Sequence, residues 1–324
     1  MSRPLRIGLI GAGRWGRVYL RTLRSLTPRM RLAHLGARHP ERAGPLPARV
    51  VVHQDWRRVI RADCDAVIIA TPAHTHAAML QACLEARKPC IVEKPLCLDV
   101  ATAERLDRRV RSSGVPVLVN HTHLFSPAYR RLKQALASGR EHTRVMVSEG
   151  MDLGPFRRET SALWDWGPHD VSLCLDLLKT TPVQVDALGG PKGSRGTPEV
   201  VSLRLGFSGG VTAWIHAGCL SPRKRRTLSV FTDRRLYVWD DTSTKPLTVR
   251  PFDFSHRYDL PFPEPLSLIP LPSRSRQTPM EHLLVYFADG LQGGDRRYFG
   301  TTLALAVVRV LARCESAMEK RSRR

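Results

Sequence analysis

The sequence of 324 residues lacks any run of about 18 uninterrupted apolar residues, the length that a membrane-spanning helix needs. Its first residues, MSRPLRIG, contain no apolar core of the kind found in secretory signals. The seven cysteines are odd in number and form no C-x-x-C pair, which argues against a disulfide framework and a thiolate zinc site. These absences predict a cytoplasmic protein with no membrane span.

Lysine is also scarce, although the chain is strongly basic. Basic residues outnumber acidic ones by 51 to 29, a formal net charge of +22 that would attract nucleic acid, phosphorylated ligands or anionic membranes. Only eight of the 51 are lysine and the arginines are scattered, which favours a general preference for arginine over a polyanion-binding surface. The densest run, RKRR at residues 223–226, is predicted to be a solvated turn between strands. We therefore expect a small-molecule partner and no nucleic acid.

The most informative stretch is LRIGLIGAGRWG at residues 5–16. A short apolar run that ends at closely spaced glycines is typical of a buried parallel strand turning into a helix. The glycines have the spacing G-x-G-x-x-G: Gly11 permits a tight turn, Gly13 lets a pyrophosphate approach, and Gly16 lets the helix lie close to the strand. The stretch predicts a dinucleotide cradle, to which Arg14 and Trp15 also contribute.

The residues that follow the second predicted strand, residues 31–35, indicate which dinucleotide the cradle binds. An NAD site usually has an acidic residue near this position, which binds the ribose hydroxyls. Residues 36–39 read GARH and contain no carboxylate, whereas an arginine at this place favours a 2′-phosphate. We therefore predict NADP, anchored by Arg38, with NAD as the alternative cofactor; the alternative interpretation of Arg38 is a solvated loop residue.

Strands and helices alternate as far as residue 120. Apolar strands are predicted at residues 50–53, 65–70, 89–93 and 115–120, with helices between them, which indicates a doubly wound parallel sheet. Two strand ends carry polar residues to the carboxyl edge, where such folds hold ligands. The predicted cofactor contacts there are Thr71, Pro72, His76, Glu93 and Lys94.

A domain boundary is predicted near His121, giving a Rossmann domain at residues 1–121 and a second domain at residues 122–324. The second domain shows strand-like segments separated by turn signals, as in a mostly antiparallel sheet. His121 and His123 suggest a metal site together with His74 and His76, but no recognised ligand spacing is present. We expect no metal, and we predict that His121 lines a substrate pocket.

The second domain also contains LWDWGPHD at residues 163–170, in which Asp165 and His169 lie four residues apart. On a helix they share one face, and a carboxylate beside an imidazole makes a general base that works near neutral pH. The alternative is an aspartate that merely caps a helix. Trp164 and Trp166 either stack on a sugar ring of the substrate or pack in the hydrophobic core. Arg157 is predicted to bind a substrate carboxylate or phosphate.

The succession LIGAGRWG, IIATPAHTH and IVEKPL resembles the Gfo/Idh/MocA family, which includes glucose–fructose oxidoreductase and inositol dehydrogenases. The resemblance covers nearly the whole chain. It implies a nicotinamide-dependent oxidoreductase with an N-terminal Rossmann domain and a C-terminal α/β domain built on a large open sheet. In the family this sheet commonly forms the subunit interface, so the resemblance also implies a homodimer or homotetramer.

The resemblance implies roles for three residues. The family's conserved lysine falls on Lys94, which would contact the nicotinamide ribose and the substrate hydroxyl, and its D-x-x-x-H motif falls on Asp165 and His169. His169 would then remove a proton from a secondary hydroxyl that Lys94 polarises, while a hydride passes to the nicotinamide. Many relatives have a further aspartate where this chain has Ser172, which leaves the substrate geometry open.

Three functions follow as alternatives. The first is an NADP-dependent dehydrogenase or reductase of a sugar, cyclitol or sugar derivative. The second is a glycosidase of the same family that oxidises its substrate transiently with tightly held NAD. The third is a non-catalytic nucleotide-binding or nucleic-acid-associated sensor. The presence of Lys94, Asp165 and His169 favours an enzyme, because a sensor needs no base.

Overall fold

The computed structural model describes residues 3–322, except 140, 157–159, 194–195, 253–268, 271–274 and 276. The chain forms two compact units. Unit 1 comprises Met1–Thr122 and Gln277–Val308, and unit 2 comprises His123–Arg276 and Arg309–Arg324.

Unit 1 contains a six-stranded parallel sheet in the order β3-β2-β1-β4-β5-β6, which confirms the predicted doubly wound fold. Its strands are β1 (Leu5–Ile10), β2 (Met30–Gly36), β3 (Val51–His53), β4 (Ala66–Ile69), β5 (Cys90–Glu93) and β6 (Val117–Asn120). Every residue of β4, β5 and β6 is buried, as expected for strands covered on both faces.

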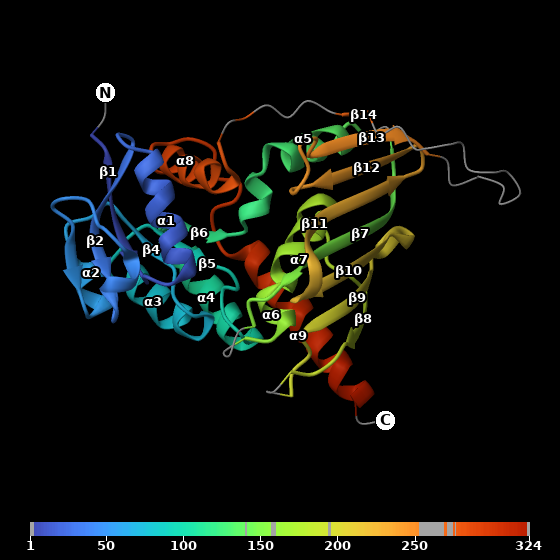
Figure 1. Cartoon of the computed structure of the whole chain (residues 1–324), viewed down its shortest axis with the longest axis horizontal. Coiled ribbons are helices and arrows are strands. Elements are labelled where there is room, and N and C mark those ends of the chain that lie inside the picture. Colours follow the sequence, from blue (N-terminus) through green and yellow to red (C-terminus); the bar gives the residue numbers. More distant parts are fainter. Residues whose placement is uncertain are drawn as a thin grey trace, which may run out of the picture. The chain divides into compact units, whose positions relative to one another are not determined.

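Helices cover this sheet in two groups. Helix α1 packs beside α8, whereas α2 contacts α3 and α3 contacts α4 (Figure 1). Their bounds are α1 (Arg14–Ser25), α2 (Trp56–Arg61), α3 (Ala73–Glu85), α4 (Val100–Ser113) and α8 (Pro279–Leu291). Asp55 and Asp99 cap α2 and α4, since their carboxylates accept hydrogen bonds from the backbone N–H groups of Arg57 and Thr102.

Residues 277–308 pack with unit 1, whereas the sequence analysis placed all of residues 122–324 in one domain. Thr278 and Glu281 form a capping box at the start of α8, and Glu281 also accepts a 2.5 Å hydrogen bond from Ser25 at the end of α1. Further along, Thr301 donates a 2.8 Å hydrogen bond to the buried Asp107. The sequence pattern identifies these helices, but their partners lie far away in the chain.

Unit 2 contains a sheet of eight strands among the described residues, in the order β14-β13-β12-β11-β7-β10-β9-β8. All neighbours are antiparallel except β7 and β10, which confirms the predicted mostly antiparallel sheet. The strands are β7 (Thr143–Leu153), β8 (Gln184–Gly189), β9 (Val200–Gly206), β10 (Thr212–Gly218), β11 (Leu220–Thr232), β12 (Arg235–Asp240), β13 (Leu247–Pro251) and β14 (Ile269–Pro270).

One face of this sheet is covered by helices. Helix α5 (Pro127–Leu136) packs against β12 and β13, and α7 (Gly167–Leu178) packs against β7 and β10 (Figure 1). The short helix α6 (Ala162–Asp165) precedes α7, and the long helix α9 (Thr302–Ser322) contributes its first part to unit 1 and its remainder to unit 2. No helix in the described ranges is long and apolar enough to cross a membrane.

The turn predicted at residues 223–226 is instead part of strand β11. Arg223, Lys224 and Arg225 are exposed, as predicted for a solvated run, whereas Arg226 is buried. Arg225 pairs with Glu149 at 3.0 Å. A basic run on its own indicates solvent exposure, but two of these arginines have carboxylate partners that the local sequence does not reveal.

Candidate functional site

The glycine stretch adopts the geometry that its spacing predicts. Gly11 has φ = +110°, and a Cβ there would lie 2.3 Å from the carbonyl oxygen of Ala70. A Cβ on Gly16 would lie 2.1 Å from the carbonyl oxygen of Gly11, so α1 approaches the end of β1 closely. A Cβ on Gly13, by contrast, would meet nothing within 4 Å, and this residue is exposed. Packing therefore requires glycine at positions 11 and 16, whereas Gly13 leaves open space in front of the backbone.

The amino end of α1 is arranged to receive an anion. The helix begins at Arg14, its cap residue Gly13 supplies no side-chain hydrogen bond, and its first turn contains no acidic residue. The first backbone N–H groups of a helix have no intrahelical partner, and the helix dipole favours negative charge there. Arg14 is exposed and Trp15 is partly exposed beside this end. The residues present therefore fit a dinucleotide pyrophosphate.

Arg38 lies at the same edge of the sheet. The N–H of Gly11 donates a 2.8 Å hydrogen bond to the carbonyl of Gly36, so the ends of β1 and β2 are tied together just before Arg38. The N–H of Ala37 donates a 2.9 Å hydrogen bond to the backbone carbonyl of His53 in β3. The Arg38 side chain is exposed. This placement gives Arg38 access to an anion near the cradle.

His76 connects the carboxyl ends of β4 and β5. Its ring is 1% exposed, with Nε2 at 2.8 Å from the carbonyl oxygen of Thr71 and Nδ1 at 2.8 Å from that of Pro95. Burial lowers the pKa of His76, and these carbonyls act in the opposite direction. Because both ring nitrogens already face protein oxygens, His76 holds in place the backbone at Thr71 and at Pro95, the residue after Lys94. Pro72, which caps α3, follows Thr71.

Glu93 belongs to a buried cluster that the sequence analysis missed. Its carboxylate accepts hydrogen bonds from Tyr19 in α1 at 2.9 Å and from Asn120 in β6 at 2.5 Å, and Asn120 also donates to Tyr19 at 2.8 Å. Burial raises the pKa of Glu93, and the neighbouring Lys94 charge opposes that shift. The cluster joins α1, β5 and β6 at the carboxyl edge. Contact between Glu93 and a cofactor stays a prediction.

Lys94 and His121 follow the last residues of β5 and β6. Glu93 pairs with Asn120 across these strands, and the N–H of His121 turns back to the carbonyl of Val119 at 2.9 Å. Lys94 is 7% exposed and His121 is 4% exposed. Two buried polar side chains thus follow the carboxyl ends of adjacent strands.

In unit 2, the D-x-x-x-H stretch is helical, as the spacing suggested. Asp165 ends α6, Trp166 joins the two helices, and His169 lies in the first turn of α7. The His169 ring is 7% exposed and lies edge-on to His123, with 4.9 Å between the ring centroids. The sequence analysis considered His123 only as a metal ligand, but its ring contacts that of the candidate base. Both histidines belong to unit 2, whereas Lys94 and His121 belong to unit 1.

A buried ion pair anchors the helix that carries His169. The carboxylate of Asp170 is fully buried, accepts a 2.7 Å hydrogen bond from Ser148 in β7, and lies 3.2 Å from the guanidinium of Arg226 in β11. Burial raises the pKa of Asp170, whereas Arg226 acts in the opposite direction. Ser172 donates a 2.8 Å hydrogen bond to the carbonyl of His169. The sequence analysis missed Ser148 and Arg226, since neither lies near the motif in the chain.

The remaining predicted substrate residues have different surroundings. Trp164 is 5% exposed and donates a 2.9 Å hydrogen bond to Glu315, so it packs in the core. Trp166 is partly exposed, and the guanidinium carbon of Arg226 lies 5.7 Å from its ring centroid. Arg157 lies outside the described residues.

Two family models match the chain. Residues 5–121 match the GFO/IDH/MocA oxidoreductase family with its NAD-binding Rossmann fold, and residues 129–238 match the GFO/IDH/MocA C-terminal domain. An oxidoreductase structure from Magnetospirillum magnetotacticum MS-1 is 35% identical, with a TM-score of 0.85, and the match covers 96% of this chain and 99% of that one. The structure of UDP-N-acetylglucosamine 3-dehydrogenase from Acidithiobacillus ferrooxidans has a TM-score of 0.84 with full coverage of both chains, but at 21% identity it shows the fold alone.

Curated relatives match over shorter stretches. Inositol 2-dehydrogenase from Mycolicibacterium gilvum is 36% identical over 148 residues, which is 44% of this chain and 42% of that protein. UDP-N-acetylglucosamine 3-dehydrogenase from Acidithiobacillus ferrooxidans is 30% identical over 192 residues, which is 57% of this chain and 58% of that protein. The chain thus spans less than two thirds of the length of either relative.

Replacing Arg226 with leucine should lower the free energy of unfolding by about 3–5 kcal/mol at neutral pH, because Asp170 then remains buried without its counter-ion. Burial raises the pKa of Asp170 and Arg226 opposes that shift, so removing Arg226 raises the folded-state pKa of Asp170 further. A carboxyl with a raised folded pKa stabilises the folded state as the pH falls through that pKa, so the variant gains more stability than the unsubstituted chain. The loss caused by Arg226→Leu should therefore shrink at acidic pH. Urea unfolding at neutral and acidic pH measures both effects.

Arg225→Leu is the matched control, because it removes the adjacent arginine of the same strand, whose side chain is 54% exposed and pairs with Glu149 at the surface. Its expected cost is below about 1 kcal/mol. Equal costs for the two variants, or a cost of Arg226→Leu that grows as the pH falls, would contradict the assigned role of the buried pair.

Proposed function

The chain belongs to the Gfo/Idh/MocA family of oxidoreductases, and on that basis we propose that it is an NADP-dependent dehydrogenase or reductase acting on a CH–OH group of a sugar, cyclitol or sugar derivative. The observation that carries the proposal is the cradle, in which Gly11 and Gly16 are fixed by packing and Gly13 faces open space before an uncapped helix. The names of the relatives are dehydrogenase names, which favours net oxidation or reduction over the glycosidase and sensor alternatives.

The cofactor-binding residues follow from this cradle. The backbone from Gly11 to Gly16, with Arg14 and Trp15, would hold the pyrophosphate, and Arg38 would bind the 2′-phosphate that distinguishes NADP from NAD. A guanidinium binds phosphate oxygens through two parallel N–H donors, which makes Arg38 a strong discriminator between these cofactors. When bound, the nicotinamide supplies the hydride acceptor or donor.

The chain itself supplies the proton transfer. His169 accepts the proton of a secondary hydroxyl as the hydride leaves the same carbon, and returns it in the reverse direction. The ammonium of Lys94 stabilises the negative charge that develops on that oxygen, and Asp165 orients the imidazole or binds a neighbouring hydroxyl. His123, edge-on to His169, restricts the orientation of the imidazole ring.

We also propose a homodimer or homotetramer formed through the uncovered face of the unit 2 sheet. Along β10, Ala213 and Ile215 are buried, whereas Trp214 between them is 47% exposed. Leu188 in β8 and Leu153 in β7 are likewise exposed, at 52% and 68%. Large apolar side chains on an open sheet face are typical of a protein–protein interface.

Arg38→Ala should raise the NADPH dissociation constant by about tenfold to a hundredfold, as expected for the loss of a charge-assisted hydrogen bond worth roughly 1.5–3 kcal/mol. The dissociation constant for NADH should change by less than about twofold. Fluorescence titration with each cofactor in parallel measures both, and Arg58→Ala, an exposed arginine of α2, is the charge-matched control. Equal effects of Arg38→Ala on NADPH and NADH would contradict the role of Arg38.

His169→Asn should lower kcat by roughly 10²–10⁴, because asparagine cannot accept the substrate proton, while NADPH affinity stays unchanged. The assay follows NADPH formation with a panel of polyols and nucleotide sugars that includes myo-inositol and UDP-N-acetylglucosamine. His142→Asn is the matched control, since His142 is an exposed histidine of the same unit that precedes β7 and lies outside the strands of the proposed interface. Turnover by His169→Asn close to that of His142→Asn would exclude His169 as the base.

A further inference from the structure

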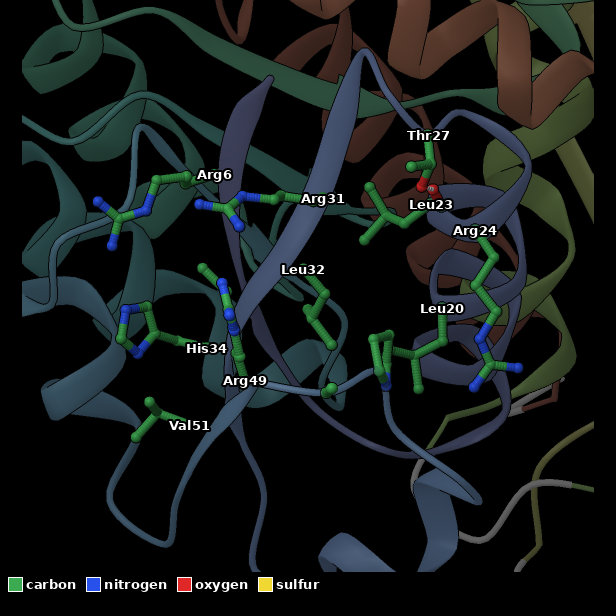
Figure 2. Close-up of a pocket in the computed structure, with 13 residues that line it drawn as sticks. Arg6, Leu20, Leu23, Arg24, Thr27, Arg31, Leu32, His34, Arg49 and Val51 are labelled. Atoms are coloured by element: carbon green, nitrogen blue, oxygen red, sulfur yellow. Dashed lines mark hydrogen bonds between the residues drawn. The ribbon is translucent and has the colours of Figure 1, made fainter. Parts of the chain in front are cut away.

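Unit 1 contains a cavity of about 360 Å³ beside strand β2. Strand β3 pairs with β2 only from His34 onward, so the first half of β2 has no strand neighbour on that side among the described residues. The second half of α1 and residues 47–49 form the walls of the cavity there (Figure 2). Its volume lies at the lower end of the range for small-molecule sites, roughly 300–1,000 Å³.

The cavity is strongly cationic. Arg6, Arg24, Arg31 and Arg49 line it, and its lining contains no carboxylate among the described residues. Arg24 donates to the carbonyl of Pro45 and has no carboxylate partner among the described residues, whereas Arg6 pairs with the exposed Asp63. Figure 2 shows Arg6, Arg31 and Arg49 gathered on one side and Arg24 on the other. Because Asp63 offsets the charge of Arg6, the potential of the concavity comes mainly from Arg24, Arg31 and Arg49, and it favours an anion with more than one negative charge.

The floor of the cavity is apolar. Leu20, Leu23 and Leu32 are only 3%, 2% and 8% exposed, and Figure 2 shows them between Arg24 and the other arginines. Val51 at the rim is 49% exposed. A ligand with an apolar or ring body can therefore contact leucine side chains while its charged group reaches the guanidinium groups.

This cavity is distinct from the cofactor cradle. Arg6 and Arg31 lie near the amino ends of β1 and β2, whereas Gly11 and Arg38 follow the carboxyl ends of the same strands. At about 3.3 Å per residue, the seven residues from Arg31 to Arg38 place the two sites about 20 Å apart. Binding in one site therefore leaves the other sterically free.

We propose that this cavity binds a small phosphomonoester whose phosphate is held by Arg31 and Arg49 and whose compact apolar or ring body rests on Leu20, Leu23 and Leu32. A dianionic phosphate offers three oxygens, which suits convergent guanidinium forks better than a single carboxylate does. The volume of the cavity suits a small molecule and not an extended polyanion, which needs a continuous basic surface.

The test uses phenyl phosphate as the probe, titrated calorimetrically into the full chain with and without saturating NADPH, beside phenol and inorganic phosphate. Phenyl phosphate should bind at one site more tightly than either comparator, and with the same affinity when NADPH is present. The double variant Arg31→Ala/Arg49→Ala should weaken it at least about tenfold, since each lost charge-assisted contact is worth roughly 1.5–3 kcal/mol. Both side chains are exposed, so thermal unfolding should show an intact fold.

The matched control is Arg58→Ala/Arg108→Ala, which removes two exposed arginines of α2 and α4 and the same total charge. It should leave the phenyl phosphate affinity within about twofold of the unsubstituted chain. Equal weakening by both double variants, displacement of phenyl phosphate by NADPH, or equal affinity for phenyl phosphate and inorganic phosphate would each overturn the proposal.

Discussion

The close approach of α1 to the end of β1 is the constraint on which the cofactor side of this protein depends. Because a Cβ on Gly16 would lie 2.1 Å from the Gly11 carbonyl oxygen, the helix can take this position only with glycine there. That position aims the uncapped N–H groups of α1 at the edge of the sheet and, one turn later, brings Tyr19 to Glu93 and Asn120. One packing contact, between Gly16 and Gly11, and one buried cluster, of Tyr19, Glu93 and Asn120, thus hold three elements in place. These are helix α1, the phosphate cradle and the strand end that carries Lys94.

Unit 2 positions the proposed base, His169, through a buried ion pair. A buried carboxylate and a buried guanidinium, Asp170 and Arg226, connect α7 to the sheet just beside His169. Removing two charges from water is costly, and a buried pair is weak evidence for stability by itself. Its value here is orientation: the pair, with Ser148, determines where the first turn of α7 lies and hence where His169 points.

The sequence predicted those features whose causes are local. The glycine spacing and the apolar strands each act within a few residues, so their patterns are visible before folding. The features that it did not predict depend on distant partners. Tyr19 and Asn120 are separated by 101 residues and Asp170 and Arg226 by 56, and Arg226 even lay in a run that suggested exposure. The packing of helix α8 with α1 likewise has no local signature.

The central claim is that the β1–α1 cradle holds a nicotinamide cofactor, and amide hydrogen exchange with and without NADPH tests it most directly. The account predicts that NADPH slows exchange at the amides of residues 13–17, the amino end of α1, while the amides of residues 200–206 in β9 are unchanged. Exchange at residues 13–17 that stays the same at saturating NADPH would contradict it.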